Sequence, residues 1–140
     1  MTHAETIIAL LKDRRKRITN GRRAIIEIFS TIGQPLAPVS VLALLRKKRS
    51  KMNKTTVYRE IDFLHRQGIL RALQFHERSK RYELASDRHT HHLICTDCQR
   101  IEDAVLDHDL DAVEKRLKTQ KQFHVQHHSL EFYGLCKACQ

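Results

Sequence analysis

Two Cys-x-x-Cys pairs constrain the fold of this chain more than any other feature of its sequence. They are Cys95-Thr96-Asp97-Cys98 and Cys136-Lys137-Ala138-Cys139, and they use all four cysteines of the 140 residues. A gap of two residues lets both thiolates of a tight turn face one ion, and two such turns supply the four sulfurs of a closed tetrahedral zinc site. The alternative is a pair of redox-active dithiols. The spacing predicts a structural Zn²⁺ that ties the end of the chain to an earlier hairpin.

Charge divides the chain into two parts near Ala85. Residues 1–84 contain 19 Lys and Arg against 7 Asp and Glu, a net charge of +12, whereas residues 85–140 contain 7 against 9, a net charge of −2. Such a basic part indicates a polyanionic partner, foremost nucleic acid, and the alternative is a solvated basic face. We expect a DNA-binding domain over residues 1–84, a hinge over 85–88 and a metal-binding domain over 89–140.

Apolar residues repeat at helical spacing in the basic part, as in the series Ile25, Ile28, Phe29 and Ile32. With the capping signals, this pattern predicts helices over 6–16, from Thr19 or Asn20 to Gly33, from Ser40, and from Asn53 to Gly68. The period then changes, and two short strands are expected over 69–74 and 81–84. Helices followed by a hairpin are the order of a winged helix-turn-helix, so the predicted fold class is α+β.

The second part predicts a small α/β domain. We expect a hairpin from His92 to Ala104, a helix over Asp109–Gln122 and a strand pair or one long strand over Phe123–Tyr133. So few elements make a thin core. This part should therefore need a metal, a partner subunit or both.

The segment that begins at Asn53 is the most informative piece of the basic part. With its apolar residues facing inward, this helix turns polar and basic side chains outward, at a width that fits one major groove. Its alternative is an ordinary amphipathic surface helix. The candidate DNA contacts are Thr55, Thr56, Tyr58 and Arg59 on the helix, with Arg17 from the earlier basic run.

Histidines cluster in the second part. Residues 89–92 read His-Thr-His-His, and Asp103, Asp111 and His128 follow downstream. Imidazoles with a helical carboxylate make a nitrogen and oxygen site suited to Fe²⁺, Mn²⁺, Zn²⁺ or Ni²⁺. The alternative is a solvated or hydrogen-bonded histidine cluster.

Three motifs together resemble the ferric uptake regulator family. They are Thr56-Val57-Tyr58-Arg59, the run from His91 to Cys98, and the run from His128 to Cys139. The resemblance spans nearly the whole chain. It implies a winged-helix domain, a dimerisation domain, and a homodimer that binds a double-stranded, roughly palindromic operator when a corepressor metal is bound.

The resemblance also implies roles for single residues. It places Cys95, Cys98, Cys136 and Cys139 on structural zinc, His89, His91, Asp111 and His128 on a regulatory metal, and Tyr58, Arg59 and Arg17 on DNA. A second regulatory site would use Glu83, His92 and Asp103. The chain departs from the family there, because Thr90 and the loop Gln34–Pro38 lack histidines that many members have. Our hypothesis is that His76 substitutes.

The function that these residues predict is a metal-dependent transcriptional repressor of metal homeostasis genes, with Fe²⁺, Zn²⁺ or Mn²⁺ as the regulatory ion. A peroxide or redox sensor on the same scaffold and a constitutive DNA-binding protein are alternatives. A zinc hydrolase is another, but the chain has no HExxH motif and no phosphate-binding glycine loop. We expect no enzyme activity and no small-molecule substrate. We also expect a cytoplasmic protein without a membrane partner, because no apolar run approaches the ~20 residues of a membrane span.

Overall fold

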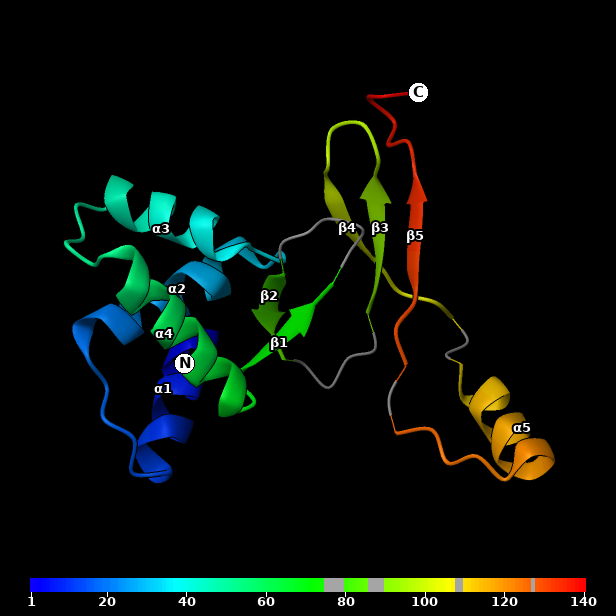
Figure 1. Ribbon diagram of the computed structural model, residues 1–140. Helices are drawn as coiled ribbons and strands as arrows, with labels where there is room; N and C mark the ends of the chain where they lie inside the picture. Colours follow the sequence, from blue (N-terminus) through cyan, green and yellow to red (C-terminus); the bar gives the residue numbers. More distant parts are fainter. Residues whose placement is uncertain (75–79, 86–89, 108–109, 127) are drawn as a thin grey trace. The chain divides into compact units, whose positions relative to one another are not determined.

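The computed structural model describes residues 1–74, 80–85, 90–107, 110–126 and 128–140. The chain forms two compact units, Met1–Ala85 and Ser86–Gln140 (Figure 1). The predicted hinge over 85–88 falls largely outside the described residues, as does the turn between the two strands of the first unit.

The first unit is a winged helix-turn-helix, as predicted. Its helices are α1 (His3–Asp13), α2 (Asn20–Ile32), α3 (Pro38–Lys47) and α4 (Lys54–Arg66). Strands β1 (Leu70–Leu73) and β2 (Arg81–Leu84) follow as an antiparallel pair. An isolated bridge between Leu36 and Tyr82 attaches the loop after α2 to this wing. The wing is thereby held to the helices by backbone hydrogen bonds as well as by side chains.

The apolar stripes of the helices meet in one core. Its fully buried side chains include Leu11 of α1, Phe29 of α2, Leu45 of α3 and Leu64 of α4. Burial of large apolar side chains stabilises each by about 1.5–3 kcal/mol, so this core is the main support of the first unit. It holds α4 with Val57, Ile61 and Leu64 inward and the opposite side chains outward.

Local capping signals set most helix boundaries. Thr19 caps α2 and Asn53 caps α4, each through a side-chain oxygen that accepts a backbone N–H three residues on, as predicted. The expected start of α3 at Ser40 was wrong. That helix begins at Pro38, because proline has no N–H to satisfy and its fixed φ suits the first helical position.

The second unit contains β3 (His91–Cys95), β4 (Ile101–Ala104), α5 (Asp111–Lys121) and β5 (Glu131–Gly134). The described strands form a sheet in the order β4-β3-β5, with β3 antiparallel to β4 and parallel to β5. The predicted long strand or strand pair over Phe123–Tyr133 was wrong, because among the described residues of this segment the pairing with the sheet begins at Glu131, in β5.

Helix α5 buries none of its residues within the chain. Its apolar Val113 and Leu117 are 46% and 38% exposed, and Phe132 of β5 is also exposed. An amphipathic helix is stable in water chiefly when its apolar face packs against something. The apolar side chains of α5 and β5 are therefore left uncovered by the described residues of this chain.

Among the described helices, none combines the length and the apolar character that crossing a membrane requires.

Candidate metal centres and nucleic-acid interface

Parallel pairing of β3 with β5 brings the four cysteines together. In this pairing Cys95 lies opposite Gly134, so both strands end at the same edge of the sheet. One Cys-x-x-Cys turn follows each strand there. Thr96 fastens the first turn to the second strand, since its backbone N–H donates to the Gly134 carbonyl at 2.8 Å. Cys95 and Cys136, which are 41 positions apart in the sequence, thus become neighbours because β3 and β5 pair in parallel.

The thiol cluster, Cys95, Cys98, Cys136 and Cys139, has the dimensions of a tetrahedral zinc site. Its ligand atoms all lie within 4.8 Å of one another. The Cys98 and Cys136 sulfurs are 3.7 Å apart, and four sulfurs about 2.3 Å from one ion would be separated by about 3.8 Å. A disulfide would need about 2.05 Å, and all four cysteines are free thiols. The donor set fits zinc.

The thiols differ in acidity. Backbone N–H groups of Cys136 and Cys98 point at the Cys95 sulfur and lower the pKa of Cys95 to about 6, which favours the metal-binding thiolate. In contrast, a hydrogen bond between the Cys139 and Cys136 side chains raises the pKa of Cys139 to about 12. Four thiolates this close repel one another unless a cation lies among them. The cluster is therefore a site that a divalent ion would complete.

A second cluster joins β3, α5 and the segment before β5. The rings of His91 and His128 are stacked with centroids 5.6 Å apart. His128 Nδ1 lies 2.6 Å from Glu114 Oε1 on α5. His91 is buried and His128 half-buried. Two imidazoles and a carboxylate from separate segments thus meet in one place, and they are ligand types that suit a divalent transition metal.

The carboxylate in this contact is not the one that the resemblance implied. Asp111 is exposed at the start of α5, and among the described residues no hydrogen bond or ion pair joins its carboxylate to His91 or His128. Glu114 lies three residues later, nearly one helical turn on. The implied ligand His89 falls outside the described residues.

The residues of the implied second site have partners within their own units. His92 Nδ1 lies 3.3 Å from Asp103 Oδ1, across the β3–β4 pair. Glu83 forms an ion pair with Arg71, its partner across the β1–β2 pair. Because Arg71 already neutralises the Glu83 carboxylate, a metal at this position would have to compete with a guanidinium. His76 falls outside the described residues.

Helix α4 presents the predicted DNA-contacting residues to solvent. Thr55, Thr56 and Arg59 are exposed, and Tyr58 is 42% exposed. Arg17 is also exposed, in the segment between α1 and α2. The first N–H groups of a helix have no partner within the helix, and among the described residues the Asn53 side chain caps one of them at α4, so the remaining N–H groups and the hydroxyls beside them suit a phosphate.

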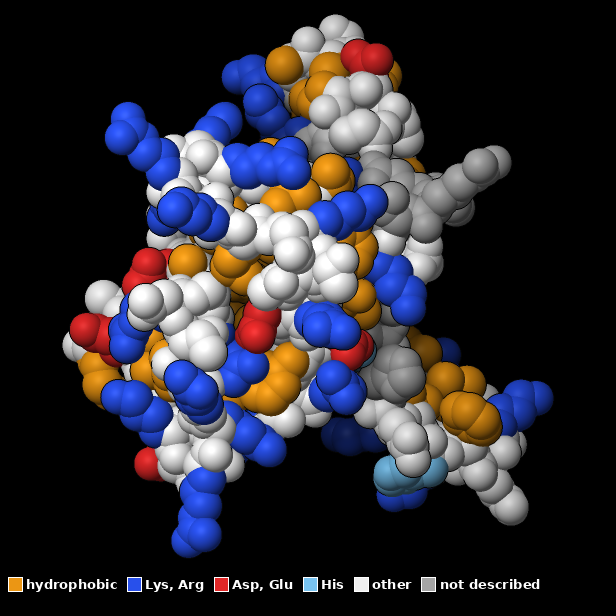
Figure 2. Space-filling model, turned by 60° about the vertical axis from the view of Figure 1, so that its left-hand side comes forward, with side chains coloured by type: hydrophobic (Ala, Val, Ile, Leu, Met, Phe, Trp, Pro, Cys, Tyr) orange, Lys and Arg blue, Asp and Glu red, His pale blue; other side chains and the backbone are white. Residues whose placement is uncertain are grey.

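Positive charge covers much of one face of the first unit. Figure 2 shows Lys and Arg side chains spread over this face with few acidic side chains between them. Exposed basic side chains come from the segment between α1 and α2, from the end of α3 with the segment after it, and from α4; they include Arg15, Lys16, Lys47, Arg49 and Arg59. Such a surface attracts a phosphate backbone over its whole extent.

The sequence model of the ferric uptake regulator family matches residues 13–133. The chain belongs to this family. It is 32% identical over 130 residues to the peroxide operon regulator of Bacillus subtilis, which covers 92% of this chain and 88% of that protein. It is 31% identical over 127 residues to the ferric uptake regulation protein of Cupriavidus metallidurans, covering 90% and 88%.

Solved structures agree with this assignment. The ferric uptake regulator from Francisella tularensis, solved with iron, is 27% identical to this chain with a TM-score of 0.77, and the match covers 88% of this chain and 93% of that one. As a ferric uptake regulator family member, the protein is a metal-responsive transcriptional repressor that binds DNA.

Two arginines of this family member occupy backbone positions that usually hold glycine. Arg15 after α1 and Arg49 after α3 have φ of 57° and 58°. Each ends its helix with the same hydrogen bonds that Gly68 makes at the end of α4. A side chain in the left-handed region costs roughly 1–2 kcal/mol. The sequence places Arg15 in the basic run before α2, but no local pattern predicts the left-handed backbone of Arg15 or Arg49.

Replacing Arg15 or Arg49 with glycine should stabilise the protein and weaken its binding to DNA. Glycine removes the strain of a side chain in the left-handed region, which stabilises the folded state. Glycine also gains more backbone entropy on unfolding, which offsets part of that gain, so the free energy of unfolding should rise by up to about 1 kcal/mol. Where the replaced arginine binds a phosphate, the slope of log K against log salt should become shallower by about 0.9. Thermal unfolding and DNA titrations at several salt concentrations measure both effects.

Gln122 provides the matched control, because it ends α5 with φ of 51° and lies in the nearly neutral second unit. Gln122→Gly should raise stability similarly and leave DNA affinity unchanged. Unaltered salt dependence in both arginine variants would mean that neither arginine meets phosphate.

Proposed function

We propose that the protein acts as a cytoplasmic homodimer that represses metal homeostasis genes when a divalent ion fills the site around His91 and His128. The contact of His91, His128 and Glu114 carries this proposal, because it joins three separate segments of the second unit through metal-ligand side chains. An ion there would stabilise one arrangement of those segments.

The thiol cluster has a different role in this proposal. Four thiolates around one Zn²⁺ leave no open coordination position, so zinc there would supply a structural crosslink rather than respond to metal supply. It would hold the two turns at the end of β3 and β5. The exposed apolar side chains of α5 and β5, among them Leu117 and Phe132, support a second copy of the chain as the cover of this unit.

Regulation follows from linkage. A metal shifts the dimer toward a DNA-binding arrangement only as far as it binds that arrangement more tightly. A coupling on the order of 1–3 kcal/mol would change DNA affinity by about 5–150-fold. This range sets the size of the response that an experiment must detect.

The test is binding of DNA by the purified protein with Fe²⁺, Mn²⁺, Zn²⁺ and Ni²⁺ added in turn, after the regulatory ion has been removed with a mild chelator. A duplex pool of random sequence serves first to select a preferred site. We expect at least one ion to strengthen binding to the selected duplex by about 5-fold or more, within the coupling range given above. Equal binding with and without every ion would point instead to a constitutive DNA-binding protein.

Glu114 should matter more for regulatory metal affinity than Asp111. In Glu114→Gln the His128 ring loses a charged partner that orients it, and such partners are typically worth about 10–100-fold in metal affinity. Asp111→Asn is the matched control on the same helix, because this carboxylate is exposed. Competition of the protein with a metal indicator dye measures both affinities. A larger loss in the Asp111 variant would restore the ligand set that the family resemblance implied.

A peroxide sensor is the second candidate, favoured by the 32% identity to the peroxide operon regulator of Bacillus subtilis. In that function Fe²⁺ bound at the histidine site would react with peroxide and oxidise a histidine ligand. Mass spectrometry of the iron-loaded protein after peroxide exposure should then find one added oxygen atom on His89 or His91. Unmodified histidines with loss of iron alone would exclude this mechanism.

A further inference from the structure

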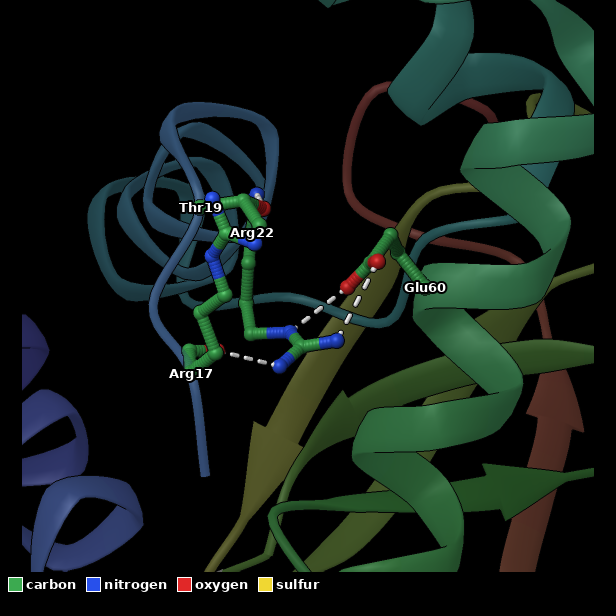
Figure 3. Close-up of polar contacts among 4 residues, drawn as sticks. All are labelled: Arg17, Thr19, Arg22 and Glu60. Carbon is green, nitrogen blue, oxygen red and sulfur yellow. Dashed lines mark hydrogen bonds and ion pairs between the residues drawn. The ribbon is translucent and has the colours of Figure 1, made fainter. Parts of the chain in front are cut away.

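Arg22, the third residue of α2, is a partly buried cation in contact with α4. Its side chain is only 11% exposed. Its Nε and Nη2 donate to the two carboxylate oxygens of Glu60 at 2.7 Å and 3.2 Å, and its guanidinium carbon lies 3.7 Å from the centroid of the Phe63 ring. Figure 3 shows the guanidinium between the two segments, directed at Glu60. A planar fork that meets a carboxylate with two parallel bonds fixes orientation as well as distance.

The third nitrogen of the same guanidinium reaches the segment before α2. Arg22 Nη1 donates to the backbone carbonyl of Arg17 (Figure 3). We call residues 14–17, which read Arg-Arg-Lys-Arg, the basic arm. The basic arm is also bonded to the end of α4, because Arg14 Nη1 donates to the backbone carbonyl of Gln67 at 2.6 Å. One end of the basic arm is therefore bonded to the C-cap of α4, and the other is linked to α4 through Arg22 of α2 and its pair with Glu60.

The charge arrangement also requires Arg22. Glu60 follows Arg59 on α4, and its side chain is only 17% exposed. An unpaired carboxylate on this helix would repel phosphates and would be costly to bury. Arg22, whose side chain is itself only 11% exposed, pairs with both of its oxygens. An apolar pair could fill the same space but could not hold the Arg17 carbonyl.

We propose that Arg22 is a positioning residue for DNA recognition, which holds the basic arm and α4 in one fixed register so that Arg17 and Arg59 meet the DNA together. The inference rests on the proposed function. Groups that are already ordered before binding lose less entropy when they bind. The pair Arg22–Glu60 thus converts two separate sets of cations into one preformed surface.

Arg22→Lys and Glu60→Gln test this role in the full-length, metal-loaded protein. Lysine keeps the charge but loses the fork, and glutamine keeps the shape but loses the ion pair. We expect each to weaken binding to the selected duplex by on the order of tenfold, the effect of one lost charge-assisted hydrogen bond. Binding to a scrambled duplex at low salt should change much less. Arg23→Lys, at the neighbouring position on α2, is the matched control.

Combining Arg17→Ala with Glu60→Gln distinguishes a positioning role of Arg22 from a general loss of stability. Arg17→Ala should weaken binding to the selected duplex in the wild-type background, and by clearly less when Glu60→Gln is already present, because the arm is then no longer held. Circular dichroism and zinc content confirm folding, and Glu60→Gln decides the matter if Arg22→Lys does not fold. Independent, additive effects of Arg17→Ala and Glu60→Gln would overturn the proposal. Failure of the wild-type protein to bind any duplex would instead refute the proposed function.

Discussion

Replacing Cys98 with serine should release zinc and unfold the second unit. Structural zinc sites bind with about 10–16 kcal/mol, so loss of one of four ligands should cost roughly 3–4 kcal/mol and weaken zinc binding by a few hundredfold. The second unit has little else to hold it together. Its buried side chains in the described residues are Ile94, Cys95 and Ile101 with the two histidines of β3, and α5 buries none.

The measurements are zinc content after dialysis, thermal unfolding and size-exclusion chromatography. We expect substoichiometric zinc, a lower unfolding temperature and loss of the dimer, while the helical signal of the first unit persists because its core does not include the thiol cluster. Lys137→Ala is the matched control, since this exposed residue lies between Cys136 and Cys139 and is no ligand. A Cys98→Ser protein with full zinc content and wild-type stability would show that the cysteines do not form a zinc site.

Replacing His91 with alanine should abolish the response of DNA binding to the regulatory ion. Removal of an imidazole from the site eliminates the difference in metal affinity between the two arrangements of the dimer, and with it the coupling. DNA affinity in the presence of the ion should fall to the value without it, a change of about 5–150-fold. Binding isotherms with and without the ion measure this directly.

Two further variants make the result specific. His128→Ala removes the stacked partner of His91 and should have the same effect, whereas His124→Ala, at an exposed position on the segment after α5, should have none. Because His91 is buried, zinc content and circular dichroism must show that the His91 variant is folded. A folded His91→Ala protein whose DNA binding still responds to the ion would remove His91 from the regulatory site.

The implied second regulatory site meets a specific obstacle in this protein. Arg71 lies directly opposite Glu83 in the β1–β2 register and pairs with its carboxylate. The cross-strand partner of a residue depends on how the strands pair. The family resemblance implied Glu83 as a ligand, whereas the residue that neutralises its carboxylate lies 12 positions earlier in the chain.

Features that depend on a few neighbouring residues were determined by the sequence itself. The caps Thr19 and Asn53 and the turn at Gly68 set helix ends through hydrogen bonds between residues close together in the chain. The two Cys-x-x-Cys pairs restrict four thiols to two tight turns, and the excess of Lys and Arg in residues 1–84 requires no particular fold to attract a polyanion.

Only the tertiary structure decided which distant groups meet. The parallel pairing of β3 with β5 brings Cys95 to Cys136, the course of α5 brings Glu114 rather than Asp111 to His128, and packing of α2 against α4 brings Arg22 to Glu60. The contact between Cys95 and Cys136 was expected from zinc chemistry, but the other two contacts were not. Contacts of this kind depend on the direction in which whole elements leave the core, and that direction is set by the packing of many side chains together rather than by any local pattern.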